Sequence, residues 1–377
     1  MLPPSSSPVG DRLHALDERF IARLAEVTRS ELAAHRRRLE EISPETATLV
    51  DSLAGYLEGG KLLRPRFCFW GGVAALGREP EAAEVEALAR YGAAIELIQA
   101  AALMHDDVID HSPMRRGRPA LHIQAERRHR EAGLVGSSEE YGIAAAIVLG
   151  DLALSWGEQM AAGVQADPAA ALGARGEFDA LRTEVMSGQF LDILHQAGGY
   201  ESSPDVELSA LSVIRWKTVP YSVLRPVRIG AALMGGPDGL LETLSSWAIE
   251  VGTAFQLRDD LLSVVGDQDE TGKPIGGDIV EGKRTVLLAR TQKATDASGR
   301  ALLDAVIGDA EAEEAQIAAA HELMISTGAV ASVAQEVRER AGRGRRLLCD
   351  AAGMGDLGRA GLDSLAALAT DVDSLPA

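Results

Sequence analysis

The sequence predicts an all-α protein. Of its 377 residues, 46% are apolar but only 4% are aromatic. Alanine and leucine are abundant and runs of β-branched residues are few, which favours packed helices over sheet. The length exceeds that of a typical domain, but one large helical domain can reach it. We therefore expect a single domain over residues 11–377, preceded by a flexible tail over residues 1–10.

The N-terminal part predicts three helices. Residues 11–41 place apolar side chains at intervals of three and four, which is the pattern of a helix with one buried face. A second helix should cover residues 44–57 and end at Gly59-Gly60, because glycine suits the left-handed turn after a helix. A long helix is expected over residues 84–110, and three aspartates end it.

The rest of the chain predicts further helices. Proline lacks a backbone N–H donor, so Pro220 should distort the helix that contains it. The expected elements up to residue 224 are a surface connection over 126–141, a helix over 141–163, a loop over 167–176, and helices over 178–195 and 206–224. A further helix should give way near Gly266 to a long polar loop. Amphipathic helices should follow from Thr285 to about Leu368, with breaks at Gly328, Gly342–Gly344, Gly353–Gly355 and Gly358–Gly361.

The net charge limits the classes of partner. A formal charge of −19 argues against nucleic acid, because phosphate binding along a polyanion needs a broad basic surface. A small anion could still bind in a locally basic pocket. Residues 1–10 lack the basic start and apolar run of a signal peptide. No apolar run reaches the roughly 20 residues that span a bilayer, so we expect a cytoplasmic protein without an integral membrane span.

The segment Ala100–His122 carries the strongest functional signal. An apolar helix ends in Asp106, Asp107 and Asp110, and the paired cations Arg115 and Arg116 follow. Asp106 and Asp110 are four residues apart, so both would lie on one helical face, where like charges repel. A bound cation would remove that repulsion.

A second acidic pair, Asp259-Asp260, follows about 150 residues later on another apolar helix, and both clusters are costly unless they meet around metal ions. Carboxylate oxygens without a nearby histidine or cysteine set favour Mg²⁺, which substrate phosphates usually complete. Cations of the chain would then pair with diphosphate oxygens. They are Lys61, Arg64, Arg115, Arg116, Lys217, Lys273 and Lys283.

A metal cluster that grips diphosphate inside an aliphatic bundle suits a substrate with an anionic head and a hydrocarbon tail. Neutralising the departing diphosphate lowers the cost of breaking its carbon–oxygen bond. Many diphosphate chemistries fit this description.

The ordered motifs narrow the choice. They are GGKLLRP from Gly59, QAAALMHDDVIDHSPMRRGRPALH from Gln99, Gly150-Asp151, GQFLD from Gly188, Lys217-Thr218, FQLRDD from Phe255 and TGKPIGGDIVEGKRT from Thr271. Together they resemble the trans-isoprenyl diphosphate synthases over residues 59–285, most closely a bacterial geranylgeranyl diphosphate synthase. The resemblance implies an all-α bundle of the isoprenoid synthase type around a central cavity, usually a homodimer. It also implies head-to-tail condensation of isopentenyl diphosphate with an allylic diphosphate, which releases pyrophosphate.

The resemblance also implies residue roles. Asp106, Asp110 and Asp259 would bind magnesium directly, with three ions around the bound diphosphate, and Asp107 and Asp260 would support them. The substrate roles follow the same motifs: Arg115, Lys217 and Lys273 would hold the allylic diphosphate, Lys61, Arg64, Gln99 and Arg116 the isopentenyl diphosphate, and Thr218 and Gln256 would stabilise the carbocation.

One position departs from the family pattern. The second aspartate motif is often DDxxD, but its fifth position here is Ser263. Because Asp259 would make the direct metal contact, we expect activity to survive, with metal affinity as the property at risk. An inactive or partner-dependent regulatory subunit is the alternative that Ser263 favours. A class I terpene cyclase is a further alternative, but no NSE-type metal motif is found, and the cations for a second diphosphate are present.

Residues upstream of the first motif should set product length. In the family the growing tail runs down the helix before this motif, where Ala101 and Ala102 occupy the positions five and four before Asp106. Neither alanine side chain would stop the growing tail at C15. Trp156 on a neighbouring helix could close the far end of the tunnel that holds the tail. We expect geranylgeranyl diphosphate, C20, with a longer polyprenyl product as the alternative. The two alanines could equally serve ordinary helix packing.

Overall fold

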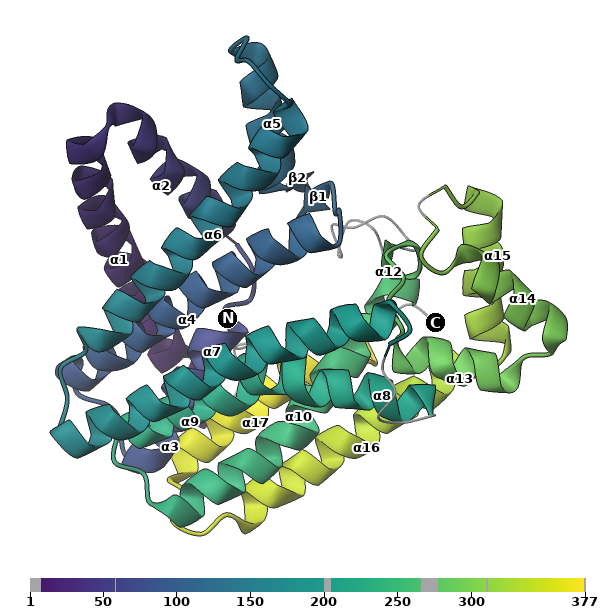
Figure 1. Ribbon diagram of the computed structural model, residues 1–377. Coiled ribbons are helices and arrows are strands. Elements are labelled where there is room, and N and C mark those ends of the chain that lie inside the picture. Colours follow the sequence, from purple (N-terminus) through teal and green to yellow (C-terminus); the bar gives the residue numbers. More distant parts are fainter. Residues whose placement is uncertain (1–7, 58, 200–204, 266–276, 310, 376–377) are drawn as a thin grey trace. The chain divides into compact units, whose positions relative to one another are not determined.

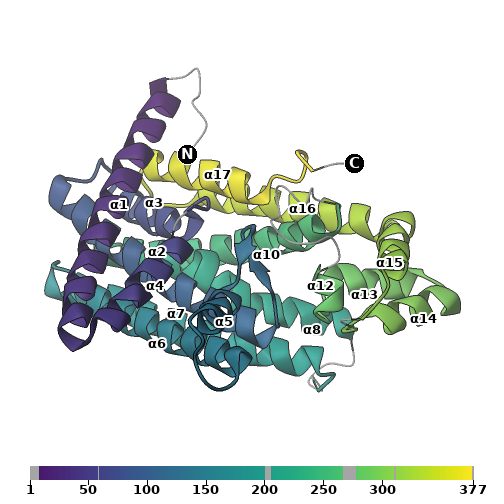
Figure 2. The same ribbon diagram turned by 90° about the horizontal axis from the view of Figure 1, so that it is seen from above.

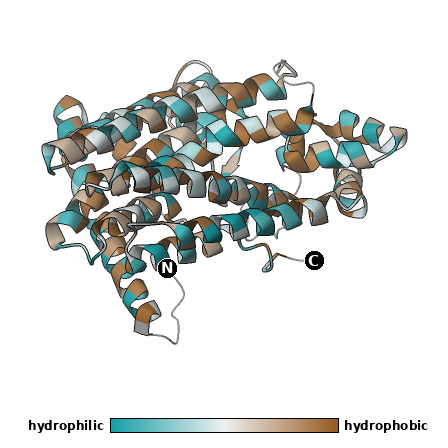
Figure 3. Cartoon of the chain, turned by 90° about the horizontal axis from the view of Figure 1, so that it is seen from below, coloured by the Kyte–Doolittle hydropathy of each residue, from teal (hydrophilic) through white to brown (hydrophobic). Residues whose placement is uncertain are grey.

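The protein is almost entirely helical (Figure 1). The computed structural model describes residues 8–57, 59–199, 205–265, 277–309 and 311–375. In these ranges the only sheet is one two-stranded antiparallel pair, β1 (Met114–Arg115) with β2 (Arg118–Pro119). The prediction of an all-α protein is confirmed. Apolar and polar residues alternate along the helices, as amphipathic helices require (Figure 3).

The chain forms two compact units. The first comprises Met1–Asp179, Arg225–Leu241 and Ala352–Leu365, and the second comprises Ala180–Leu224, Glu242–Ala351 and Ala366–Ala377. The chain passes from one unit to the other within three helices. These are α7 (Pro168–Gln196), α10 (Asp238–Val265) and α17 (Asp356–Thr370). That residues 11–377 act as a single domain around a central cavity stays a prediction.

The first unit is built around α4 (Ala82–Ile109). This helix packs on α6 (Ser138–Ala162) and on α3 (Leu63–Leu76), and α3 packs in turn on α9 (Arg225–Leu233). The remaining helices of this unit are α1 (Pro8–Ile42), α2 (Pro44–Leu57), α5 (Leu121–Glu131), the first part of α7 and most of α17. An 18-residue window of α4 is apolar enough for a membrane span, but 78% of it is buried within the protein, as in the core helix of a globular unit.

The second unit contains a distorted helical segment. The segment comprises α8 (Val206–Val213) and two π-helical turns, η1 (Ile214–Thr218) and η2 (Pro220–Leu224), so the distortion predicted at Pro220 is confirmed. The other helices are the rest of α7, most of α10, and α12 (Gly277–Val280), α13 (Val286–Ala294), α14 (Ala297–Val306), α15 (Glu314–Ser326) and α16 (Ala329–Asp350). Helices α13, α14 and α15 form one group (Figure 2).

Several predicted boundaries were wrong. Helix α1 starts at Pro8 and not at residue 11, and proline suits this position because its missing N–H would be unpaired at a helix start anyway. The predicted connection over 126–141 is confined to residues 132–137, because α5 continues to Glu131 and α6 already starts at Ser138. Helix α5 buries only a narrow stripe of side chains among charged residues, so its pattern is hard to detect in the sequence. The predicted loop over 167–176 belongs to α7, whose start is capped by the Asp167 side chain accepting from the amides of Ala169 and Ala170.

Two of the predicted glycine breaks lie inside helices. Gly342–Gly344 belongs to α16 and Gly358–Gly361 to α17. A Cβ at Gly358 would lie 2.2 Å from the Cα of Ala74 in α3, and one at Gly361 would overlap the Trp70 ring. These two glycines therefore permit close helix packing, and they do not end a helix.

Candidate active site

Asp107 of the first aspartate motif is buried and bound on both oxygens. Arg115 Nε donates to its Oδ1 at 2.8 Å, and the Tyr56 hydroxyl donates to its Oδ2 at 3.0 Å. Burial raises the pKa of Asp107, and the charge of Arg115 opposes that rise. Asp106 and Asp110 lie one helical turn apart, since the amide of Asp110 donates to the carbonyl of Asp106 at 2.8 Å. The three aspartates thus divide into one that orients an arginine and two half-buried carboxylates.

The two arginines after the motif lie in a tight hairpin. Arg116 and Gly117 connect β1 to β2, and their φ angles are +51° and +71°. Positive φ at both positions gives a turn whose twist matches that of the two strands. Arg116 Nη1 donates to the backbone carbonyl of Tyr56 at 3.3 Å. The hairpin therefore directs Arg115 to the aspartate motif and Arg116 to the end of α2.

Arg116 also lies against the glycine turn before α3. A Cβ at Gly60 would lie 3.4 Å from Arg116 Nη2, and Lys61 is the next residue in the chain. Burial raises the pKa of Glu96 in α4, and the charges of Arg64 and Arg116 oppose the rise, so these three side chains share one neighbourhood. The predicted cations for the isopentenyl diphosphate are thus brought together within the first unit.

Gln99 lies one turn after Glu96 on α4 and is 6% exposed. Buried amide groups normally have hydrogen-bond partners. Its Oε1 has none in the described part of the chain. No neighbouring helix in that part of the chain therefore bonds this oxygen, and the amide group could turn its N–H donors toward an anion.

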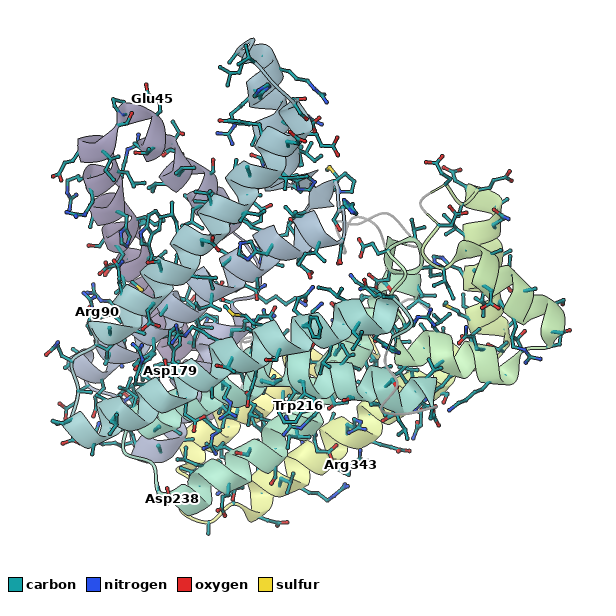
Figure 4. The ribbon with its side chains drawn as sticks, in the orientation of Figure 1. Glu45, Arg90, Asp179, Trp216, Asp238 and Arg343 are labelled. Atoms are coloured by element: carbon teal, nitrogen blue, oxygen red, sulfur yellow. The ribbon has the colours of Figure 1, made fainter. Side chains whose placement is uncertain are left out.

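Lys217 is held by an acidic partner in the second unit. Its Nζ donates to Asp192 Oδ2 at 2.5 Å, and both side chains are largely buried. Gly188 makes this possible because a Cβ there would lie only 2.5 Å from the Lys217 backbone, so α7 and η1 meet without a side chain between them. The neighbouring Trp216, labelled in Figure 4, is 42% exposed.

A chain of hydrogen bonds links η1 to the second aspartate motif. Thr218 Oγ1 donates to Gln256 Oε1 at 2.7 Å, and Gln256 Nε2 donates to Asp260 Oδ1 at 2.7 Å. Burial raises the pKa of Asp260 well above its ordinary value, although Gln256 opposes the rise. Asp259 is exposed. The hydroxyl of Ser263 donates to the backbone carbonyl of Asp260 at 2.8 Å, so it is turned back onto its own helix.

The two remaining predicted lysines differ. Lys283 Nζ donates to Glu281 Oε2 at 2.6 Å and to Asp278 Oδ1 at 3.4 Å, and its charge acts on Asp260. It therefore lies near the second motif, and its contact with a diphosphate stays a prediction. Lys273 lies outside the described residues.

Sequence reasoning missed Tyr56 and the roles of Asp192 and Glu96. A single tyrosine in an amphipathic helix has no pattern that distinguishes it from a packing residue. Asp192 lies within the GQFLD motif, but its pairing with Lys217, 25 residues away, depends on helix packing. Glu96 belongs to no motif, and only its proximity to the GGK and RRG motifs in the folded chain indicates a role for it.

The profile of the Polyprenyl synthetase family matches residues 47–324. The chain belongs to this family. A geranylfarnesyl diphosphate synthase of Natronomonas pharaonis is 32% identical over 271 residues, which are 68% of this chain and 72% of that protein. A nonaprenyl diphosphate synthase of Mycobacterium tuberculosis is also 32% identical, over 68% of each chain.

A solved polyprenyl synthetase structure is similar along nearly the whole chain. It is a geranylgeranyl pyrophosphate synthase from Corynebacterium glutamicum complexed with isoprenyl diphosphate and magnesium, with a TM-score of 0.87 and 35% identity. The match covers 94% of this chain and 98% of that one. The names of these relatives span several product lengths, so family membership alone does not fix the length made here.

The donor set fits the magnesium that the family implies. In the described ranges no group of three or more His, Cys, Asp or Glu residues could hold a metal ion by itself. Asp106 and Asp110 offer oxygen ligands on adjacent turns, and exposed Asp259 offers another in the second unit. Hard carboxylate oxygens that leave positions for phosphate and water are what Mg²⁺ prefers. That the two motifs share the ions stays a prediction.

The proposed length-determining positions of this polyprenyl synthetase lie on α4 and α6, two helices that pack against each other. Ala101 is fully buried and Ala102 is half-buried. Trp156 of α6 is 5% exposed and stacks on His35 of α1, with ring centroids 4.2 Å apart. A Cβ at the adjacent Gly157 would lie 3.1 Å from the carbonyl oxygen of Ala94, so α4 and α6 approach closely there. The roles of Ala101, Ala102 and Trp156 in setting length stay predictions.

Proposed function

We propose that the protein condenses isopentenyl diphosphate head-to-tail with an allylic diphosphate and forms trans-geranylgeranyl diphosphate, C20. The observation that carries the proposal is the position of Arg116 against Gly60, next to Lys61 and in the neighbourhood of Arg64. This cluster offers a second diphosphate a site separate from Arg115 and the aspartate motif. Cyclisation uses one diphosphate and condensation uses two, so the cluster favours condensation over a terpene cyclase.

The residues of the chain have distinct tasks in this mechanism. Asp106, Asp110 and Asp259 would hold Mg²⁺, which supplies Lewis-acid stabilisation of the departing diphosphate. We infer three ions by analogy with the family. Lys217, oriented by Asp192, supplies a fixed positive charge for the same group.

Thr218 and Gln256 suit the stabilisation of a carbocation. The hydroxyl proton of Thr218 is directed to Gln256, so the lone pairs of Oγ1 remain available to a developing positive charge. The Gln256 amide is fixed in turn by Asp260. The two side chains are therefore pre-oriented before substrate binds.

The C20 length is supported by the α4–α6 contact. Ala101 and Ala102 carry small side chains on the first turns upstream of Asp106, so neither would block a tail there. The close approach at Gly157 and Ala94 lies 12 residues before Asp106, about 18 Å along α4. A tail that follows α4 would meet this contact, beside which Trp156 precedes Gly157 on α6, and this favours a product of limited length over a long polyprenyl chain.

A homodimer in the cytoplasm is part of the proposal. Exposed apolar side chains at helical spacing support it, because such surfaces often mark protein interfaces. On α7 these are Met186, Phe190 and Ile193. Light scattering of the purified protein should give the mass of two chains, and Phe190→Asp should shift it toward that of one.

Direct assay tests the reaction. The purified protein, Mg²⁺, farnesyl diphosphate and labelled isopentenyl diphosphate should give a labelled C20 diphosphate, and excess EDTA should stop its formation. No elongation by the protein alone would refute an autonomous synthase and favour the regulatory-subunit alternative. Asp106→Ala should lower turnover by at least about a hundredfold.

A further inference from the structure

Tyr56 occupies the junction of four elements of the first unit. It lies at the end of α2 and is half-buried. Its hydroxyl donates to Asp107 Oδ2 of α4 at 3.0 Å and accepts from the amide of Leu121, the first residue of α5, at 2.8 Å. Its backbone carbonyl accepts from Arg116 Nη1 at 3.3 Å. A residue chosen only for packing would not need this set of polar contacts.

The phenol replaces two missing partners. The N-cap residue of α5, Ala120, has no side chain that can accept from the first turn, so the Leu121 amide would lack an acceptor without Tyr56. The buried Asp107 carboxylate needs donors on both oxygens, and Arg115 supplies only the one on Oδ1. Burial and the charge of Asp107 raise the pKa of Tyr56, so its hydroxyl stays protonated and remains a donor.

The contacts reach the two arginines by different routes. The route to Arg115 runs through the Tyr56 hydroxyl and the Asp107 carboxylate. The route to Arg116 uses only the backbone carbonyl of Tyr56. Loss of the hydroxyl would therefore loosen Arg115 and leave the contact of Arg116 intact.

We propose that Tyr56 is a positioning residue that fixes Arg115 for the allylic diphosphate through its hydroxyl and Arg116 for the isopentenyl diphosphate through its carbonyl. This inference rests on the proposed function for the identity of the two substrates. It assigns Tyr56 no contact with either one. Its specific consequence is that removal of the hydroxyl weakens one substrate site and spares the other.

Tyr56→Phe tests this split because it removes only the hydroxyl. The KM for farnesyl diphosphate should rise about tenfold, the usual scale for losing a group that orients a ligand-binding residue, and the KM for isopentenyl diphosphate should change less than about twofold. Asp107→Asn, which removes the charge that holds Arg115, should give the same selective rise. Tyr141→Phe is the matched control, since this tyrosine of α6 is 45% exposed, and it should change neither constant.

Two further measurements separate positioning from stability. In a double-mutant cycle, Tyr56→Phe should have little effect once Arg115 is replaced by lysine, because the hydroxyl acts through Arg115. An equal rise in both KM values, additive effects in the cycle, or a lowered melting temperature with unchanged KM values would each overturn the inference.

Calorimetry keeps this test independent of turnover. Tyr56→Phe should weaken binding of farnesyl thiodiphosphate about tenfold and leave binding of isopentenyl diphosphate unchanged. If the wild-type protein binds both ligands but does not elongate, the proposed function fails and the positioning role is still measured. If the wild-type protein elongates and the variant binds both ligands as the wild type does, only the positioning role fails.

Discussion

Lys217 of η1 donates a hydrogen bond of 2.5 Å to Asp192 of α7, at the level where Gly188 lets the two backbones meet. The carboxylate holds the ammonium group in one position before any substrate arrives. A fixed charge stabilises a leaving group better than a mobile one, because no reorganisation is needed during the reaction.

Removing this charge should slow the reaction strongly. We expect Lys217→Ala to lower kcat about a hundredfold, the usual cost of losing one fixed donor at a developing charge, and Asp192→Asn to lower it less, about tenfold. Lys293→Ala is the control, since this exposed lysine pairs with Asp205 and Glu207 and should leave kcat unchanged. Steady-state assays measure all three. Equal activity of Lys217→Ala and wild type would contradict a role for this lysine in the reaction.

The long apolar helices could be predicted from the sequence, whereas charged or glycine-bearing ones could not. Helices α4 and α10 combine length with apolar residues at most positions, so their existence and their aspartates were predictable. Helix α5 buries only Leu121, Ala125 and His129 among charged neighbours, and that pattern resembles a surface loop. Position 361 of α17 is occupied by glycine because the Trp70 ring leaves no room for a side chain there, and this constraint is visible only in the packed structure.

The same distinction holds for the candidate site. Motif spacing indicated Lys217, Thr218 and Gln256, but not that they form two networks with Asp192 and Asp260. Tyr56 was missed entirely. Hydrogen bonds between distant helices depend on rotation and depth of packing, and neither leaves a periodic signal in one sequence.

A buried ion pair in the first unit predicts a large effect on stability. Arg66 donates to both Asp17 oxygens, at 3.0 and 2.8 Å, and all of these groups are fully buried. Trp70 Nε1 also donates to Asp17 at 3.1 Å. Arg66→Met leaves the Asp17 charge buried without its cation, so it should lower the free energy of unfolding by about 3–5 kcal/mol.

Urea unfolding measures this loss. The exposed pair Arg36 and Asp51 provides the control, and Arg36→Met should cost less than about 1 kcal/mol. The double variant Arg66→Met with Asp17→Leu removes both charges and should recover part of the loss. Equal effects of Arg66→Met and Arg36→Met would contradict the burial argument.

Acid should weaken the first unit through Glu177. Burial raises the pKa of this side chain, but hydrogen bonds from Arg228 and Arg225, both at 2.6 Å, outweigh burial and hold the pKa below its ordinary 4.5. The folded state therefore binds this proton less readily than the unfolded state. Its contribution to stability is present above about pH 4.5 and is lost as the pH falls through the folded pKa.

Glu177→Gln should remove this contribution. We expect the variant to be less stable than wild type at pH 7 by about 1–3 kcal/mol, because two half-buried guanidinium groups lose their counter-charge. The difference should shrink as the pH falls below 4.5. Urea unfolding at pH 7 and pH 3.5 measures both values. A difference that grows on acidification would have the wrong sign.

Product length provides a test of the α4–α6 contact. Ala101 is fully buried on α4, five residues before Asp106, where the proposed C20 product would pass. Ala101→Phe should place a benzyl group in that proposed path and shorten the main product from C20 toward C15, while the first condensation continues because Asp106 and Asp110 are unchanged. Ala319→Phe on the exposed face of α15 adds the same ring elsewhere and should leave the product at C20. Chromatography of the dephosphorylated products measures length, and circular dichroism checks folding. A well-folded Ala101→Phe variant that still makes C20 would exclude this path along α4, because a benzyl group at the fifth residue before Asp106 would have to obstruct any tail lying against that face.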